Sequence, residues 1–191
     1  MKYLTMLLLG GVLMLAACAT PEVTTAPDEA ASDVAATEPV APASTPEPEP
    51  TETARVGSTI SLTGNDEGAE VAVKVVEVID GAAAANEFFQ AEAGNKFIAV
   101  RVELSNTGQA VYSDAPRNGA LLLNAANEQF TATIAEVQGC QEFAGGGVTL
   151  PPGSTALGCL TFELPADATA ARFQFTLDSG FGPETGIWEL A

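Results

Sequence analysis

The stretch Asn95–Gly108, NKFIAVRVELSNTG, carries the clearest structural signal in this sequence of 191 residues. Apolar side chains recur at every second position from Ile98 to Leu104, and Arg101 and Glu103 lie between them. This alternation is typical of a β-strand with one face in a core and the other in solvent. The closing residues, Ser-Asn-Thr-Gly, favour a turn. The stretch therefore predicts a strand whose inner face carries Ile98, Val100, Val102 and Leu104.

Segments of the same kind lie on both sides of this strand, separated by residues that favour turns. In residues 70–80 the alternation slips at Val75 and Val76, which indicates either a β-bulge or a strand buried on both faces. Residues 81–93, GAAAANEFFQAEA, favour a short helix. Many short strands joined by turns predict an all-β fold, an immunoglobulin-like antiparallel β-sandwich. The other expected strands are residues 58–63, 120–124, 128–137, 157–165, 171–178 and 187–190.

Three runs of this sequence resemble a known family: FFQAEAGNKFIAVRVELSNTG at 88–108, LLLNAANEQF at 121–130 and LPPGSTALGCLTFELP at 150–165. They are similar to a family of bacterial lipoprotein domains of unknown function, and the similarity extends over about residues 57–191. That family resembles a telokin-like immunoglobulin fold, so the resemblance implies this fold here. It implies no catalytic residues, because the shared pattern contains none.

The first 17 residues predict a lipoprotein signal peptide. The apolar run Tyr3–Ala17 follows Lys2 and is 15 residues long, shorter than the roughly 20 residues of a transmembrane helix. The residues Leu15-Ala16-Ala17-Cys18 resemble a bacterial lipobox, which implies cleavage before Cys18 and a diacylglyceryl group on its thiol. Two or more acyl chains hold a protein stably at a bilayer. The alternatives are an ordinary secretory signal, in which Cys18 is incidental, and an uncleaved anchor.

Residues 18–55 predict a disordered tether between the lipidated cysteine and a domain that spans residues 56–191. Pro, Glu, Thr, Ala and Ser dominate the tether, which has no aromatic residue and no basic residue before Arg55. Such a composition buries too little apolar surface to offset the entropy of ordering. We expect it to act as a spacer between membrane and domain. The alternative is a segment that binds a partner.

Cys140 and Cys159 remain once Cys18 is assigned to the lipid. An exported domain meets oxidising conditions, so we predict a disulfide between them. Alternation along residues 157–165 places Cys159 opposite Leu160 and Phe162, facing away from the core. The bridge should therefore pin the glycine-rich loop around Cys140 onto the outer face of that strand. The alternatives are two free thiols or a metal site, for which two cysteines without histidine are a poor ligand set.

The composition excludes several classes of function. The chain has no histidine, which removes Ser-His-Asp and Cys-His catalysis within the chain. Its formal charge of −18, from 25 acidic and 7 basic residues, argues against nucleic-acid binding and against attraction to anionic lipid. We therefore predict a protein that is not an enzyme and that uses no cofactor and no metal.

Several turns, loops and aromatic residues are candidates for metal or partner binding. The turns at Asn65–Glu67 and at Asp178–Gly180 are rich in oxygen ligands, although neither has the spacing of a calcium loop. The pair Phe88-Phe89 is a candidate recognition surface, and Trp188 is expected to fill the core. The long loop 143–153 is the best candidate for a partner-facing surface. Within it, the predicted contact residues are Phe143, Gly145, Gly146 and Gly147.

Together these features predict a lipoprotein that displays a non-catalytic binding or interaction domain outside the cytoplasm. Acyl groups on Cys18 would hold it in a lipid bilayer, and its partner would be a protein or glycan of the envelope or the exterior. Because Ala19 follows Cys18, a cell with two membranes would carry it on the outer membrane, and a cell with one would carry it on the outer face of the cytoplasmic membrane. The alternatives are a structural or envelope-assembly lipoprotein and a hydrolase that uses paired carboxylates.

Overall fold

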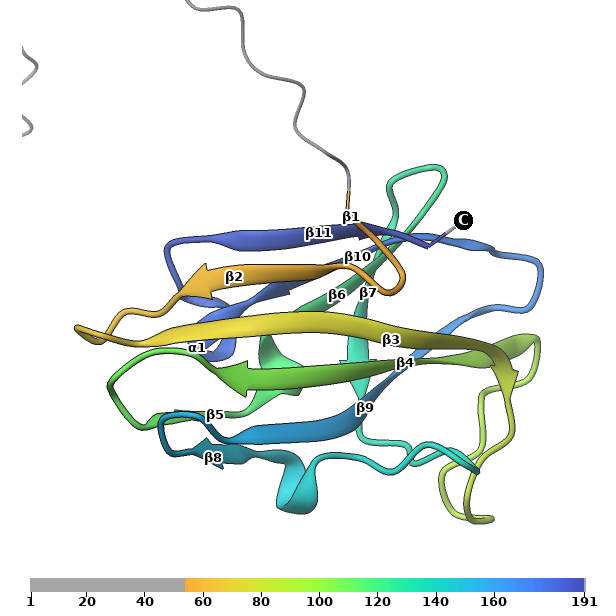
Figure 1. Cartoon of the computed structure of the whole chain (residues 1–191). Helices are drawn as coiled ribbons and strands as arrows, with labels where there is room; N and C mark the ends of the chain where they lie inside the picture. Colours follow the sequence, from red (N-terminus) through yellow and green to blue (C-terminus); the bar gives the residue numbers. More distant parts are fainter. Residues whose placement is uncertain (1–53, 191) are drawn as a thin grey trace, which may run out of the picture. The chain divides into compact units, whose positions relative to one another are not determined.

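In a computed structural model of the chain, the described residues, 54–190, form strands that pack in two layers (Figure 1). The predicted signal peptide, Cys18 and the tether up to residue 53 lie outside these residues. The order of paired strands is β1-β11-β10-β6-β7-β9-β4-β3-β2. The strands are β1 Ala54–Arg55, β2 Thr59–Thr63, β3 Glu70–Ala82, β4 Asn95–Asn106, β5 Tyr112–Asp114, β6 Ala120–Asn124, β7 Gln129–Thr133, β8 Val148–Leu150, β9 Thr155–Pro165, β10 Ala170–Thr176 and β11 Thr185–Glu189.

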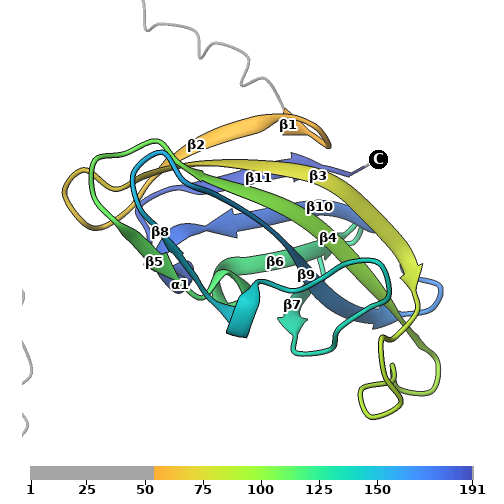
Figure 2. The ribbon, with the colours of Figure 1, turned by 60° about the horizontal axis from the view of Figure 1, so that its bottom comes forward.

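The two layers share one continuous path of hydrogen bonds, because the short strand β7 pairs with β6 on one side and β9 on the other. Strands β2, β3, β4 and β9 form one layer, and β6, β10 and β11 form most of the other (Figures 1 and 2). All pairs in this path are antiparallel except β1 with β11. The small sheet β5-β8 and the short helices η1 Pro116–Gly119, η2 Ala144–Gly146 and α1 Leu177–Gly180 lie in the connections. This is the predicted antiparallel β-sandwich.

Strand β4 has the face assignment that its sequence predicts. Ile98, Val100 and Leu104 are fully buried in the main core. The register of β3 against β4 shifts between Val75 and Glu77, and Val76 is 37% exposed. Of the two readings of the Val75-Val76 slip, the structure supports the β-bulge.

The main core between the layers contains a group of packed aromatic rings. Phe173 lies at the centre of this group, with ring centroids 6.2 Å from Phe162, 6.2 Å from Phe175 and 5.8 Å from Trp188. Trp188 is fully buried, as predicted, and its indole N–H donates to the carbonyl oxygen of Ser58 at 3.0 Å. The hydrogen bond supplies the partner that a buried indole requires.

The structure differs from the sequence prediction in the segment between β3 and β4 and at the boundary of the tether. Residues 83–94 contain no helix, because backbone groups of Ala83 and Ala85 bond to residues 136–138 instead of to their own chain. This long-range pairing outweighs the helical preference of the alanines. Ala54 and Arg55, assigned to the tether from composition, form β1 and pair with Trp188 and Glu189.

The aromatic group yields a prediction about stability. Phe173→Ala should lower the free energy of unfolding by about 3–5 kcal/mol, because it removes a fully buried ring and leaves a cavity. Phe181→Ala is the matched control, since Phe181 is 81% exposed, and its effect should be within about 0.5 kcal/mol. Urea unfolding of both variants measures the difference. Equal effects would mean that the group around Phe173 does not form the core.

Candidate interaction site

On the face of β4 and β9 that points away from the main core, side chains of both strands form a second apolar cluster with a covering loop segment. Alternation along β9 turns Cys159 away from Leu160 and Phe162, as predicted, yet Cys159 is only 2% exposed. A segment of the loop between β7 and η2 lies over it. The cluster comprises Phe97, Ala99, Ala135, Val137, Cys140 and Cys159.

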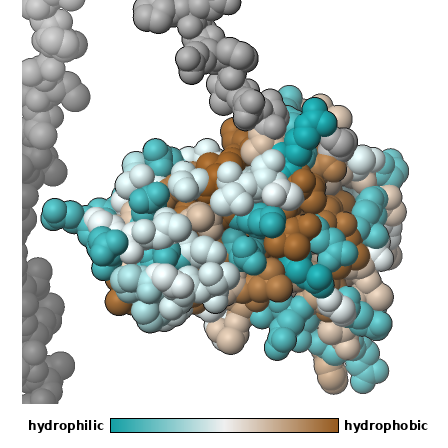
Figure 3. All heavy atoms as spheres, viewed as in Figure 1, coloured by the Kyte–Doolittle hydropathy of each residue, from teal (hydrophilic) through white to brown (hydrophobic). Residues whose placement is uncertain are grey.

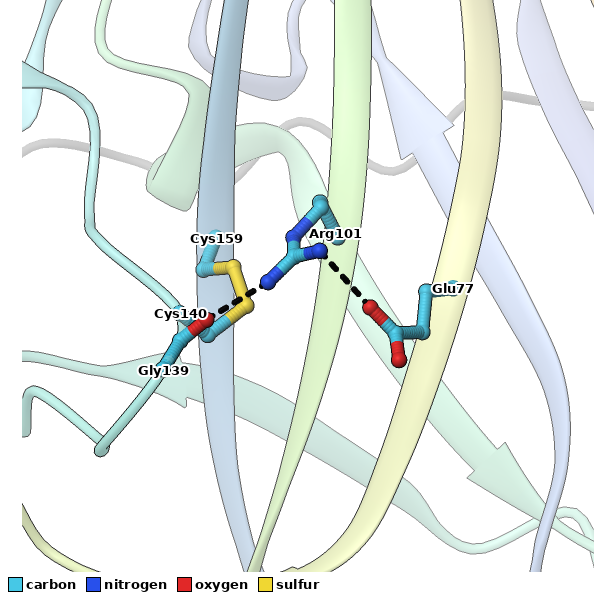
Figure 4. Close-up of polar contacts among 5 residues, drawn as sticks. All are labelled: Glu77, Arg101, Gly139, Cys140 and Cys159. Carbon is cyan, nitrogen blue, oxygen red and sulfur yellow. Dashed lines mark hydrogen bonds and ion pairs between the residues drawn. A yellow bond between two sulfur atoms is a disulfide. The ribbon is translucent and has the colours of Figure 1, made fainter.

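The covering segment, residues 134–142, is called the strap below. It is fastened by the disulfide between Cys140 and Cys159, whose Cα atoms are 5.6 Å apart. The backbone N–H of Cys159 also donates to the carbonyl oxygen of Gln141 at 2.9 Å. Arg101 adds a third fastening, because its guanidinium donates to the carbonyl oxygen of Gly139 at 2.6 Å and pairs with Glu77 at 2.8 Å (Figure 4). These contacts fix the strap across β9, β4 and β3.

The strap in turn supports the segment between β3 and β4, residues 83–92, called the aromatic loop below. The backbone N–H of Ala85 donates to the carbonyl oxygen of Glu136 at 2.8 Å. The backbone N–H of Gln138 donates to the carbonyl oxygen of Ala83, also at 2.8 Å. This loop projects past the ends of the strands (Figures 1 and 2). Its two rings are open to solvent: Phe88 is 83% exposed and Phe89 is 44% exposed.

The conformation of the aromatic loop is set by one side chain. The Oδ1 atom of Asn86 accepts from the backbone N–H groups of Phe88 at 3.0 Å and of Phe89 at 3.2 Å. The side-chain amide of Gln90 donates back to the carbonyl oxygen of Asn86. Asparagine commonly caps turns in this way. The backbone that carries the two rings is therefore held in a turn.

Negative charge surrounds the aromatic loop. Glu87, Glu92 and Glu136 are exposed, and none of them takes part in an ion pair among residues 54–190. The nearby cation Lys96 is paired with Asp80 at 2.9 Å. The lower right of Figure 3, where the loop projects, shows apolar residues beside hydrophilic ones. An apolar tip with an acidic rim is the chemical character of this site.

The partner surface predicted in the loop 143–147 is wrong at Phe143. This ring is buried in the main core and lies over Gly158 of β9, where an added Cβ would come within 2.5 Å of the ring. Because Gly158 has no side chain, it leaves the space that the Phe143 ring fills. The residue that allows Phe143 to be buried therefore lies 15 positions further along the chain. Gly145 is exposed, and Gly146 and Gly147 are half-buried. Their predicted role in partner binding stays a prediction.

The two oxygen-rich turns, far apart in sequence, lie together. The backbone N–H of Asn65 donates to the Asp178 carboxylate at 2.6 Å, and the Asn65 side chain donates to the carbonyl oxygen of Phe181 at 3.1 Å. The neighbouring Asp114 accepts from the hydroxyls of Tyr112 at 2.6 Å and Ser179 at 2.8 Å. Protein donors thus occupy these carboxylates, and no group of three or more Cys, Asp or Glu among the described residues has metal-site geometry.

A shallow hollow on the other side of the aromatic loop contains two carboxylates, those of Glu92 and Glu163, beside strand β7. Glu163 accepts from the backbone N–H of Glu92 at 2.7 Å and from the side-chain amide of Asn95 at 2.9 Å. These bonds fix the base of the aromatic loop to β9. Glu163 therefore makes a structural contact here.

Residues 63–184 match the family model described as a domain of unknown function, DUF4352. The chain belongs to the DUF4352 family. No curated protein sequence matches it. A domain family of unknown function is thereby shown, as the resemblance implied, while the lipoprotein and telokin-like assignments stay predictions.

Solved structures similar in fold to this DUF4352 domain include a secreted protein and a predicted lipoprotein. MPT63, a secreted protein from Mycobacterium tuberculosis, is 15% identical over 75% of this chain and 99% of its own, with a TM-score of 0.53. The predicted lipoprotein ycdA from Bacillus subtilis is 16% identical over 72% of this chain and 38% of its own (TM-score 0.52). The yjhA protein from Bacillus subtilis is 13% identical over 73% and 100% (TM-score 0.51). At these identities the likeness shows the fold alone.

Among residues 54–190, no helix is both long enough and apolar enough to span a bilayer.

The disulfide yields a prediction about the strap. Replacing Cys140 and Cys159 by alanine should lower the free energy of unfolding by about 3 kcal/mol, because the bridge closes a loop with a sequence separation of 19. Amide hydrogen exchange should rise in the strap and the aromatic loop while β10 and β11 stay protected. Reduction of the natural protein is the control and should give the same pattern. Unchanged exchange in residues 83–92 would show that the strap does not support the aromatic loop.

The cluster at the two turns yields a prediction about alkaline pH. Burial, followed by the hydrogen bond to Asp114, raises the pKa of Tyr112 well above its ordinary value of 10.0. The neutral phenol therefore contributes stability that is present below about pH 10 and lost as pH rises further. In a chain without residues 1–17, Tyr112 is the single tyrosine, so the ultraviolet absorbance of tyrosinate reports on it alone. Tyrosinate should appear only with unfolding; titration near pH 10 in the folded protein would contradict the buried cluster.

Proposed function

We propose that this chain is a lipoprotein, anchored through Cys18, whose DUF4352 domain acts outside the cytoplasm as a non-catalytic interaction domain. The observation that carries the interaction role is the exposed pair Phe88-Phe89, whose backbone is fixed on a disulfide-fastened support. Aromatic side chains are enriched in the cores of protein interfaces. Two consecutive exposed phenylalanines on an ordered turn add nothing to the core, so a recognition role explains this arrangement better than folding does.

The location outside the cytoplasm is supported by independent features. The strap depends on a disulfide, and disulfides persist in oxidising compartments. Structures with the same fold include a secreted protein and a predicted lipoprotein. The leader and Leu15-Ala16-Ala17-Cys18 supply the export signal and the attachment point. A structural role in envelope assembly is the second candidate, and it differs from the first only in what the domain touches.

The anchor is tested in cells that make the full-length chain. Cys18→Ala should move the protein out of the membrane fraction or leave it unprocessed, because no acyl chain can then be attached. The double variant Cys140→Ala with Cys159→Ala is the matched control and should stay in the membrane fraction, since it retains Cys18. Cell fractionation and the mass of the mature N-terminal peptide measure both. A Cys18→Ala protein that is cleaved normally and remains membrane-bound would overturn the proposed anchor.

A further inference from the structure

The aromatic loop, residues 83–92, differs from every other exposed apolar position of the described domain. The exposed large aliphatic side chains are between 37% and 57% exposed, and scattered residues of this kind are common on protein surfaces: Val56, Val76, Val111, Ile134, Leu157 and Ile187. Phe181 is 81% exposed but stands alone, and only its backbone carbonyl is used, by Asn65. Phe88 and Phe89 instead are neighbours in the chain, and both are exposed.

The backbone of the loop that carries the pair is also preorganised. Asn86 fixes the turn by accepting from both phenylalanine N–H groups, and the base of the loop is bonded to the strap and to Glu163. A loop whose backbone is already ordered loses less conformational entropy on association. A disulfide beneath the strap keeps this support in place.

The charge around the pair restricts what that pocket can be. Glu87 and Glu92 lie in the same loop as the rings, and Glu136 lies in the strap that bonds to this loop. None of the three has an ion-pair partner among the described residues, and Lys96 is neutralised by Asp80. Like charges opposed across an interface cost free energy, whereas complementary charges speed encounter and fix the register. A second copy of this acidic chain and an anionic bilayer are both disfavoured by the same repulsion. The rim therefore requires a positively charged surface.

We propose that the aromatic loop docks into an apolar pocket with a basic rim on a protein partner, with Phe88 as the inserted ring. The inference rests on the proposed interaction role and adds to it the surface used and the chemistry of the partner. Phe89, about half as exposed as Phe88, lies at the edge of the same contact. Glu87 and Glu92 face lysine or arginine residues of the pocket rim.

The test places a photo-crosslinking phenylalanine analogue at position 88 of the full-length chain in cells that make it. Position 181 is the matched control, because it is an equally exposed phenylalanine outside the aromatic loop. We expect an adduct of one mass at position 88 that is absent at 181, and mass spectrometry should map it to an apolar pocket flanked by Lys or Arg. Equal adducts at both positions, an adduct with lipid or glycan, a self-adduct, or no adduct would each overturn the proposal.

The mapped partner is then used as the binding probe for substitutions. Phe88→Ser should weaken its affinity by about tenfold or more, as for a buried aromatic anchor, and Phe181→Ser should leave it unchanged. The pair Glu87→Gln with Glu92→Gln should slow association and remove its salt dependence. An unchanged affinity for Phe88→Ser would overturn the anchor role. Membrane fractionation of the same cells keeps this result separate from the proposed function: a correctly anchored chain without an adduct defeats only the docking proposal.

Discussion

The alternation of side chains along β4 and β9 creates two apolar layers, and the rest of the domain is arranged around them. One set of positions fills the main core with Ile98, Val100 and Leu104 from β4 and with Leu160 and Phe162 from β9. The other set would face solvent, but Phe97, Ala99 and Cys159 are apolar as well. Burial of this second set is favourable only if another segment covers it. The strap is that segment, and the disulfide makes the cover permanent.

The covered face explains how an exposed loop becomes a fixed surface. A loop of ten residues between two strands would normally sample many conformations. Here the strap provides a backbone to which Ala83 and Ala85 bond, and Glu163 holds the other end of the loop. Phe88 and Phe89 are thus displayed from a support that is itself built on β4 and β9. The strands of the sandwich position the aromatic loop, and the exposed rings come from the loop itself. Widely used folds often carry their functional residues on such loops.

The opposite end of the domain shows a different use of acidic residues. Asp114 and Asp178 act as acceptors for backbone and hydroxyl groups of other turns, so their oxygens hold the chain connections together. Around the aromatic loop, Glu87 and Glu136 make no ion pair among the described residues and remain exposed. Composition alone shows a strongly acidic protein; the structure separates carboxylates that stabilise the fold from carboxylates that give one surface its charge.

The sequence by itself determined the features that depend on local periodicity and on residue type. The period of two in residues 98–104 predicted which face of β4 is buried, and the parity of Cys159 predicted the orientation of the disulfide. The slip at Val75 marked an irregularity, which the structure identified as a bulge. Tertiary structure alone decided the features that depend on contacts between distant residues. The helix-favouring run at 81–93 pairs with residues 136–138. Phe143 packs in the core over Gly158, and the backbone of Asn65 bonds to Asp178. Local propensity differs by less than about 1 kcal/mol per residue, so a few long-range hydrogen bonds or one buried ring outweigh it, and no pattern in the sequence identifies the partner beforehand.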